Sequence, residues 1–143
     1  MNLSPSLRAK WFPRVSLVSL LLAGCGAIEP PPPSHPHATV IFDVTVPADT
    51  PDNVVVTVVG SDPSLGGGAA PGFRLRRQET HYMGTVRLPV GEEVSFELWV
   101  DEAWRPELTA EGSPAPRHSF QVDGDMTVTA TVERWGEPGQ GPR

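Results

Sequence analysis

Apolar and polar residues alternate along most of the chain beyond residue 37. In the segment 38–46, every second position is apolar: Val40, Phe42, Val44 and Val46. Side chains two residues apart lie on the same face of a strand, so this pattern predicts a strand with one buried face. Similar or densely β-branched patterns predict further strands at 53–60, 73–77, 81–89, 92–100, 118–122 and 126–135.

The order of these segments predicts the fold class. No window of ten or more residues repeats with the period of a helix, and turn-forming residues separate the predicted strands. Seven short strands in a chain of this length predict an all-β fold, a single antiparallel β-sandwich of about seven strands. The dense apolar composition of 53–60 favours a central position in its sheet. Only Val90 and Gly91 separate 81–89 from 92–100, so these two strands are predicted to form a hairpin.

The predicted strand 92–100 has one apolar face and one mixed face. Its inward residues would be Val94, Phe96, Leu98 and Val100. Trp99 is then left on the outer face, beside Glu97. Trp104 follows soon after, so the two tryptophans could form a small aromatic platform with Glu97 and Arg105 as polar partners. The alternatives are that Trp99 covers a second small core or that Trp104 fixes the position of its loop.

The first 24 residues have the pattern of an export signal. Three basic residues and no acidic one lie within 1–14, and the apolar run 15–23 follows. That run is too short to span a bilayer, which needs about 20 apolar residues. It therefore predicts a cleaved secretory signal and not a transmembrane helix.

The apolar run ends in Leu22-Ala23-Gly24-Cys25, which contains the only cysteine of the chain. These four residues resemble the lipobox of bacterial lipoproteins. The resemblance implies a signal peptide over 1–24 and lipidation of Cys25, which would anchor the exported chain to the bacterial membrane. Gly26 stands where an aspartate would often mean inner-membrane retention, and this favours the outer membrane. The alternative is an ordinary signal peptide with an incidental cysteine.

A proline-rich stretch follows the cysteine, with Pro30–Pro33 and Pro36. These prolines favour extended polyproline II, so 25–37 is predicted to be a semi-rigid tether. His35 and His37 flank Pro36. Two histidines without a third ligand indicate a solvated tether, and no metal site is predicted.

One folded domain is predicted over 38–135, followed by a disordered tail over 136–143. The chain has 11 Lys+Arg and 17 Asp+Glu, a net charge of −6, which falls to −9 when the three basic residues of the signal are lost. An acidic surface argues against nucleic acid and anionic lipid headgroups as partners. With no second cysteine to pair with Cys25, the core alone must hold the domain together.

The sequence lacks the constellations that carry catalysis or bind a cofactor. Glu92 and Glu93 are adjacent on a predicted strand, so their carboxylates point to opposite faces. The glycines 66–68 are not followed by Lys-Ser or Lys-Thr and open no helix, which excludes a phosphate-binding loop. Nucleophile-elbow and Cys-x-x-Cys motifs are absent. The chain is therefore predicted to be non-catalytic and to use no cofactor. Three connections are long enough to carry function: 47–52, 61–72 and 101–117.

Three stretches, 54–67, 81–100 and 117–135, together resemble a family-20 starch-binding module. The motif positions that match are Val58-Val59-Gly60, Leu65-Gly66, Leu88-Pro89-Val90-Gly91, Phe96-Glu97-Leu98, Trp104, Arg117-His118 and Trp135. The resemblance covers about 38–135. It implies the same sandwich, immunoglobulin-like in its strand arrangement, and binding of starch-like α-glucan. Trp135, at the end of a strand, is predicted to close the core.

The family's main site uses two exposed tryptophans, a lysine and an asparagine. A pyranose stacks its apolar C–H face on a flat aromatic ring, and its hydroxyls need fixed hydrogen-bond partners. Here the first tryptophan position falls among the glycines 66–68 and Ala69, the lysine is Glu97 and the asparagine is Arg117. Trp104 keeps the second tryptophan position, and Tyr82 aligns with another family aromatic. The candidate carbohydrate-binding residues are Trp99, Trp104, Tyr82, Glu97 and Arg117.

Two functions are consistent with these features. The first is a non-catalytic, membrane-anchored lipoprotein that binds carbohydrate, by family resemblance a starch-like α-glucan, through aromatic stacking. The second is a structural or protein-interaction lipoprotein of the cell envelope, which keeps the sandwich but has lost glycan binding. Such a protein would hold a protein partner through a strand edge or its acidic face.

Overall fold

The computed structural model describes residues 34–100 and 104–139. All described residues belong to one compact unit, Pro33–Arg143. The predicted signal peptide, the lipidation at Cys25 and most of the proline tether lie outside the described residues. Within the described part, no helix is long and apolar enough to cross a membrane.

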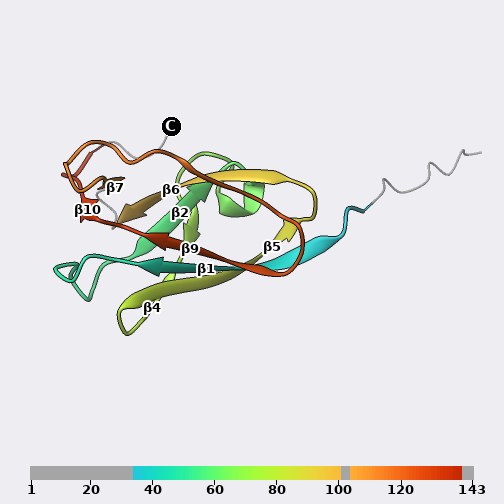
Figure 1. Ribbon diagram of the computed structural model, residues 1–143, viewed down its shortest axis with the longest axis horizontal. Helices are drawn as coiled ribbons and strands as arrows, with labels where there is room; N and C mark the ends of the chain where they lie inside the picture. Colours follow the sequence, from blue (N-terminus) through green and yellow to red (C-terminus); the bar gives the residue numbers. More distant parts are fainter. Residues whose placement is uncertain (1–33, 101–103, 140–143) are drawn as a thin grey trace, which may run out of the picture. The chain divides into compact units, whose positions relative to one another are not determined.

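The described unit is built from two β-sheets (Figure 1). Its strands are β1 (His37–Thr45), β2 (Val56–Gly60), β3 (Phe73–Arg74), β4 (Arg76–Gln78), β5 (His81–Pro89), β6 (Glu93–Val100), β7 (Arg105–Leu108), β8 (His118–Gln121), β9 (Met126–Thr131) and β10 (Arg134–Trp135), with one short 3-10 helix, η1 (Pro63–Leu65). One sheet has the order β4-β5-β1-β9. The other has the order β10-β7-β6-β2-β3, and β8 pairs with β6. The predicted all-β sandwich is confirmed.

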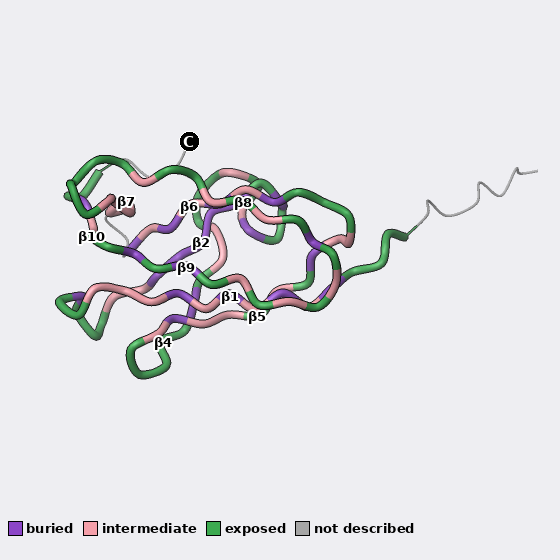
Figure 2. Tube along the Cα trace, viewed as in Figure 1, coloured by how far each residue is buried: buried purple, intermediate pink, exposed green. Residues whose placement is uncertain are grey.

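The core lies between the two sheets, where alternate side chains of each strand are buried. Along β1 and β6, buried and partly exposed positions alternate, as Figure 2 shows for β1. Phe42 of β1 meets Phe96 of β6 edge to face, with ring centroids 5.3 Å apart, and Phe120 of β8 at 6.0 Å. These aromatic contacts join the two sheets. The apolar faces predicted for 38–46 and 92–100 are therefore the faces that form the core.

The predicted hairpin between 81–89 and 92–100 is wrong. β5 pairs with β1 and β4, whereas β6 pairs with β2, β7 and β8, so the chain crosses from one sheet to the other at Val90-Gly91. The two turn residues hydrogen-bond to other segments: Val90 N donates to Pro36 O and Gly91 N to Val122 O, each at 2.8 Å. Both strands carry an apolar face, and crossing lets both faces enter the same core.

The predicted strand 73–77 also changes sheet along its length. β3 pairs with β2 in one sheet and β4 pairs with β5 in the other. Leu75, between them, is buried, and its N–H donates to Val56 O. Gly84 makes room for this crossing, because a Cβ there would lie 2.6 Å from Phe73 Cε1 and 2.8 Å from Leu75 Cδ2.

Other predicted elements hold with smaller changes. All five residues of β2 are buried, and β2 lies between β6 and β3, so the central position predicted for it is confirmed. One pair departs from the antiparallel expectation, because β1 and β9 run parallel. The segment predicted as the loop 101–117 contains β7, and the predicted tail begins with a buried Gly136 whose N–H donates to Pro106 O.

Candidate functional site

The outer face of β6 carries the residues that the sequence placed there. Phe96 and Leu98 are each 1% exposed and face the core. Glu97 and Trp99, which alternate with them, are partly exposed on the other face. The sequence therefore predicted correctly which residues of this strand face solvent.

A groove lies beside β6 where its two neighbours on one edge leave a gap. β8 pairs with the first half of β6, ending at Phe96, and β7 pairs with its last two residues, Trp99 and Val100. Between those two partners, Glu97 and Leu98 border a hollow of about 190 Å³. Its other lining residues are Trp99, Pro106, Glu107, Pro114, Ala115 and Pro116. Three prolines make the far wall of this groove stiff and apolar.

Trp99 and Trp104 are in contact, but they do not form a flat platform. Their ring centroids are 6.0 Å apart and the rings meet at 76°, edge to face. Trp104 has a φ of 52°, in the left-handed region that costs a non-glycine residue about 1–2 kcal/mol. The pair therefore forms an aromatic corner beside the groove. The indole nitrogen of Trp99 is buried, and no residue that the structure describes accepts its hydrogen bond.

Glu97 and Arg117, two predicted site residues, are bonded to each other. Arg117 Nη2 and Nε both donate to Glu97 Oε1, at 2.7 and 3.0 Å. The side chains are 33% and 53% exposed, so the pair contributes only about 0–1 kcal/mol to stability. Among residues 34–100 and 104–139, nothing donates to the other oxygen, Glu97 Oε2. This carboxylate therefore keeps one acceptor oxygen for a hydroxyl group of a ligand.

A second polar pair supports the wall of the groove. His118 Nε2 and Glu107 Oε2 are 2.7 Å apart and join β8 to β7. The imidazole ring also stacks on Phe96, with centroids 4.9 Å apart and an angle of 18°. The hydrogen bond to Glu107 raises the pKa of His118, against the opposing effect of partial burial, and the negative charge of Glu107 adds to the rise.

Sequence reasoning missed Glu107 and the strand that carries it. Proline is rare inside a sheet because it has no N–H to donate, and Pro106 made the segment look like loop. The carbonyl of Pro106 accepts a hydrogen bond from Gly136 N. The alternation of Arg105 and Glu107 about Pro106 was the only available signal of a strand.

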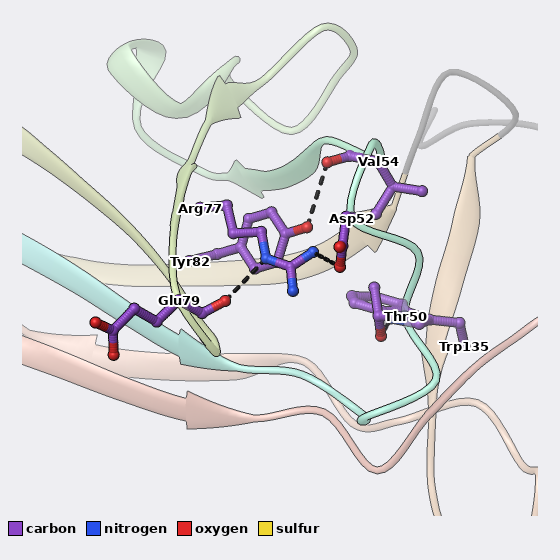
Figure 3. Close-up of polar contacts among 7 residues, drawn as sticks. All are labelled: Thr50, Asp52, Val54, Arg77, Glu79, Tyr82 and Trp135. Atoms are coloured by element: carbon purple, nitrogen blue, oxygen red, sulfur yellow. Dashed lines mark hydrogen bonds and ion pairs between the residues drawn. The ribbon is translucent and has the colours of Figure 1, made fainter.

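Tyr82, one of the predicted carbohydrate-binding residues, is buried in the core, which argues against that role. Its side chain is 1% exposed, and its hydroxyl donates to Val54 O at 3.3 Å (Figure 3). A buried ring cannot stack on a sugar. Trp135 is partly buried against the core, as predicted, and its indole nitrogen donates to Thr50 Oγ1 at 3.1 Å.

The polar groups around Tyr82 tie two loops together. Arg77 forms an ion pair with Asp52, and its Nε donates to the backbone oxygen of Glu79 at 2.8 Å (Figure 3). One guanidinium group thus links the connection before β2 to the turn between β4 and β5. Arg77 lies opposite Tyr82 in the pairing of β4 with β5.

A glycine turn lies where the resemblance to a starch-binding module implied the first tryptophan. Gly66, Gly67 and Gly68 all have positive φ, and Gly66 ends η1. A Cβ on Gly66 would lie 2.4 Å from Ala69 O. At Gly67 and Gly68, after the matching Gly66, a Cβ would meet nothing within 4 Å, so only the positive φ disfavours a side chain at these two positions.

The histidines of the predicted tether, His35 and His37, are exposed. Across the described ranges, no three side chains of His, Cys, Asp or Glu come together as metal ligands would.

The chain is similar to part of a larger enzyme. The sequence matches no protein-family model. It is 33% identical over 99 residues to an alpha-amylase from Niallia circulans, and this alignment covers 68% of the chain and 8% of the amylase. The chain therefore spans only a small part of the length of this relative.

Solved structures share the fold. A gamma-CGTase from alkalophilic Bacillus clarkii is 22% identical with a TM-score of 0.56, over 68% of this chain and 15% of that one. A glucoamylase from Hormoconis resinae is 16% identical with a TM-score of 0.56, over 75% of this chain and 19% of that one. A family 20 CBM of the maltotetraose-forming amylase from Pseudomonas saccharophila STB07 is 18% identical with a TM-score of 0.48, over 66% of this chain and all of that one. At these identities the first two likenesses establish the sandwich fold.

Proposed function

We propose that this chain is a non-catalytic carbohydrate-binding lipoprotein that takes a starch-like α-glucan in the groove beside β6. The observation that carries the proposal is the aromatic corner of Trp99 and Trp104 next to this groove. The similar proteins are an alpha-amylase, a glucoamylase and a CGTase, and the chain matches a small part of each. A part of this size without catalytic motifs fits a binding module.

The geometry of the groove suits a short stretch of sugar chain. One pyranose ring would stack its C–H face on an exposed indole face, and the three prolines would contact a neighbouring apolar edge. Glu97 Oε2 would accept a hydrogen bond from a sugar hydroxyl, while Arg117 holds the carboxylate in place. Each stack contributes about 1 kcal/mol beyond buried area, so we expect weak binding, on the order of micromolar to millimolar.

The same proposal includes export and anchoring at Cys25. The signal-like residues 1–24 and the lipobox-like ending support this part of the proposal: the domain would lie outside the cytoplasm, on a proline-rich tether from the bacterial membrane, with the outer membrane favoured. A tethered binding domain would hold glucan close to the cell envelope.

One observation favours a second function. Glu97 and Arg117 stand at the lysine and asparagine positions and already bond each other, and the glycine turn removes the first tryptophan. A domain that had lost its ligand would have the same features. In that case the chain is a structural or protein-interaction lipoprotein of the envelope.

Retention in a native gel that contains soluble starch distinguishes these two functions. We expect the full chain, in neutral detergent, to be retarded by starch but not by dextran or a sugar-free gel. Trp99→Ala and Trp104→Ala should each weaken binding about fivefold, the equivalent of ~1 kcal/mol for one lost stack. Trp104→Phe, which keeps a stacking ring, should retain most of the binding.

Arg134→Ala, an exposed change on β10 away from the groove, serves as the matched control and should bind as the wild type does. If starch does not retard the folded wild-type chain, the glucan proposal fails and the protein-interaction function stands. Retardation that survives both tryptophan changes would place the glucan site elsewhere on the domain.

A further inference from the structure

The edge formed by β3 and β4 carries a row of arginines in a chain whose net charge is −6. Arg74 and Arg76 are two residues apart, with Leu75 buried between them, and both side chains are exposed. Both line a hollow at the edge of the sandwich, where the chain passes from β3 of one sheet to β4 of the other. This hollow is separate from the groove beside β6, which belongs to the other sheet.

These two guanidinium groups are not neutralised by the protein. Neither has an ion-pair or hydrogen-bond partner among residues 34–100 and 104–139. The nearby carboxylates are already engaged, since Asp43 bonds His81 at 2.8 Å and Asp52 pairs with Arg77. Two positive charges without a partner among the described residues therefore line one hollow on a chain of net negative charge.

The surroundings of the arginines suit a peptide better than a sugar. The hollow is lined by Ile41, Met83, Thr85 and Gln78, and its one aromatic residue, Phe73, packs on Gly84 and the core. No flat aromatic surface is offered here for a pyranose, among the residues lining the hollow. Guanidinium groups bind carboxylates through paired N–H donors, and the aliphatic floor suits ordinary side chains.

The spacing of the arginines matches an extended chain. β3 and β4 are extended, so the backbone advances about 6.7 Å from Arg74 to Arg76, twice the rise of one strand residue, although the two residues pair into different sheets. An extended peptide has the same repeat. β3 and β4 also lie at the edges of their sheets, where an added segment has access.

We propose that the β3–β4 edge binds an extended acidic segment of a partner protein, with carboxylates two residues apart on Arg74 and Arg76. Because this edge and the β6 groove are built from different residues, one domain would hold glucan at one site and a protein at the other. A tethered domain of this kind would bring its partner to the glucan.

The test is fluorescence anisotropy with a labelled heptapeptide that has three glutamates at alternate positions, and a matched peptide with glutamines instead. We expect the full chain to bind the glutamate peptide and not the glutamine peptide, with affinity falling as salt is added. The variant Arg74→Ala/Arg76→Ala should lose about tenfold or more in affinity. Arg134→Ala, a single exposed arginine on β10, should bind as the wild type does.

A charge-reversal variant tests whether the charge of these two residues decides which peptide binds, which a general loss of binding could not show. Arg74→Glu/Arg76→Glu should bind a lysine version of the peptide and reject the glutamate version. Equal binding of the glutamine peptide, or binding that survives the double alanine change, overturns the proposal. Binding of heparin fragments or inorganic phosphate at these arginines, without binding of the glutamate peptide, assigns the edge to another anion and also overturns it.

Charged residues on edge strands also prevent pairing between copies of a protein. If the peptide does not bind and Arg74→Val/Arg76→Val makes the chain aggregate, the arginines prevent edge-to-edge pairing between copies and the proposal is wrong. Retention of the double alanine variant in the starch gel reports separately on the β6 groove, so the failure of one proposal does not imply the failure of the other.

Discussion

The two outer faces of the sandwich carry different chemistry on the same architecture. The face around β6 has two tryptophans in contact, three prolines and an ion pair between Glu97 and Arg117. The face of the β4-β5-β1-β9 sheet carries exposed threonines of β9 and, at its β4 edge, Arg76, which has no ion-pair partner among the described residues. Both faces rest on one core. The inward-facing residues of each strand form the core and determine the fold. The outward-facing residues do not contribute to the core and can differ between the two sheets.

The largest expected effect comes from a substitution in the core that supports both faces. Phe42 is fully buried and contacts Phe96 and Phe120 across the sandwich. Phe42→Ala should lower the free energy of unfolding by about 3–5 kcal/mol, because a cavity replaces the ring. Chemical denaturation measures this, and both binding activities should fall together.

Thr127→Ala, at an exposed position of the neighbouring strand β9, should change the same quantity by less than about 0.5 kcal/mol. A loss of under 1 kcal/mol for Phe42→Ala would mean that the two sheets do not depend on this aromatic contact.

A substitution with a smaller effect should weaken peptide binding and leave starch binding unchanged. A Cβ at Gly84 would lie 2.6 Å from Phe73 Cε1, so Gly84→Ala must displace β3 or bend β5. Overpacking of this kind costs about 1–3 kcal/mol. We expect the glutamate peptide to bind more weakly while retention by starch is kept, since the β6 groove contains no residue of β3, β4 or β5. Equal loss of both activities would contradict the independence of the two faces.

The smallest expected effect concerns pH and the groove alone. Glu107 raises the pKa of His118 in the folded chain above its ordinary value of 6.5. The folded state therefore binds this proton more tightly than the unfolded state does. The stabilisation is complete below pH 6.5 and is lost as the pH rises through the folded pKa.

Thermal unfolding between about pH 5 and pH 9 measures this contribution. Glu107→Gln should remove this part of the pH dependence, and His118→Phe, which keeps a ring to stack on Phe96, should remove it as well. Identical pH profiles for the wild type and Glu107→Gln would show that the pair does not act as described.

The candidate site was only partly predictable. The period of two along β6 placed Trp99 and Glu97 outward, and this is confirmed. Sequence alone did not reveal that Glu97 bonds Arg117, because the two residues are 20 positions apart and meet only when β8 pairs with β6. Nor did it reveal that Tyr82 is buried, because its inward position follows from the pairing of β5 with β1, in which Tyr82 lies opposite the buried Val44.

The sequence by itself determined which face of each strand is buried, because side-chain direction alternates along a strand whatever its neighbours are. It therefore predicted the all-β sandwich, the inward residues of β1 and β6, and the absence of long helices from the described part. Only the tertiary structure decided which strands pair. Every sequence offers nearly the same backbone hydrogen-bond donors and acceptors. The short turn at Val90-Gly91 is therefore compatible with a hairpin and with a crossing to the other sheet. The crossing forms because it lets the apolar faces of β5 and β6 share one core.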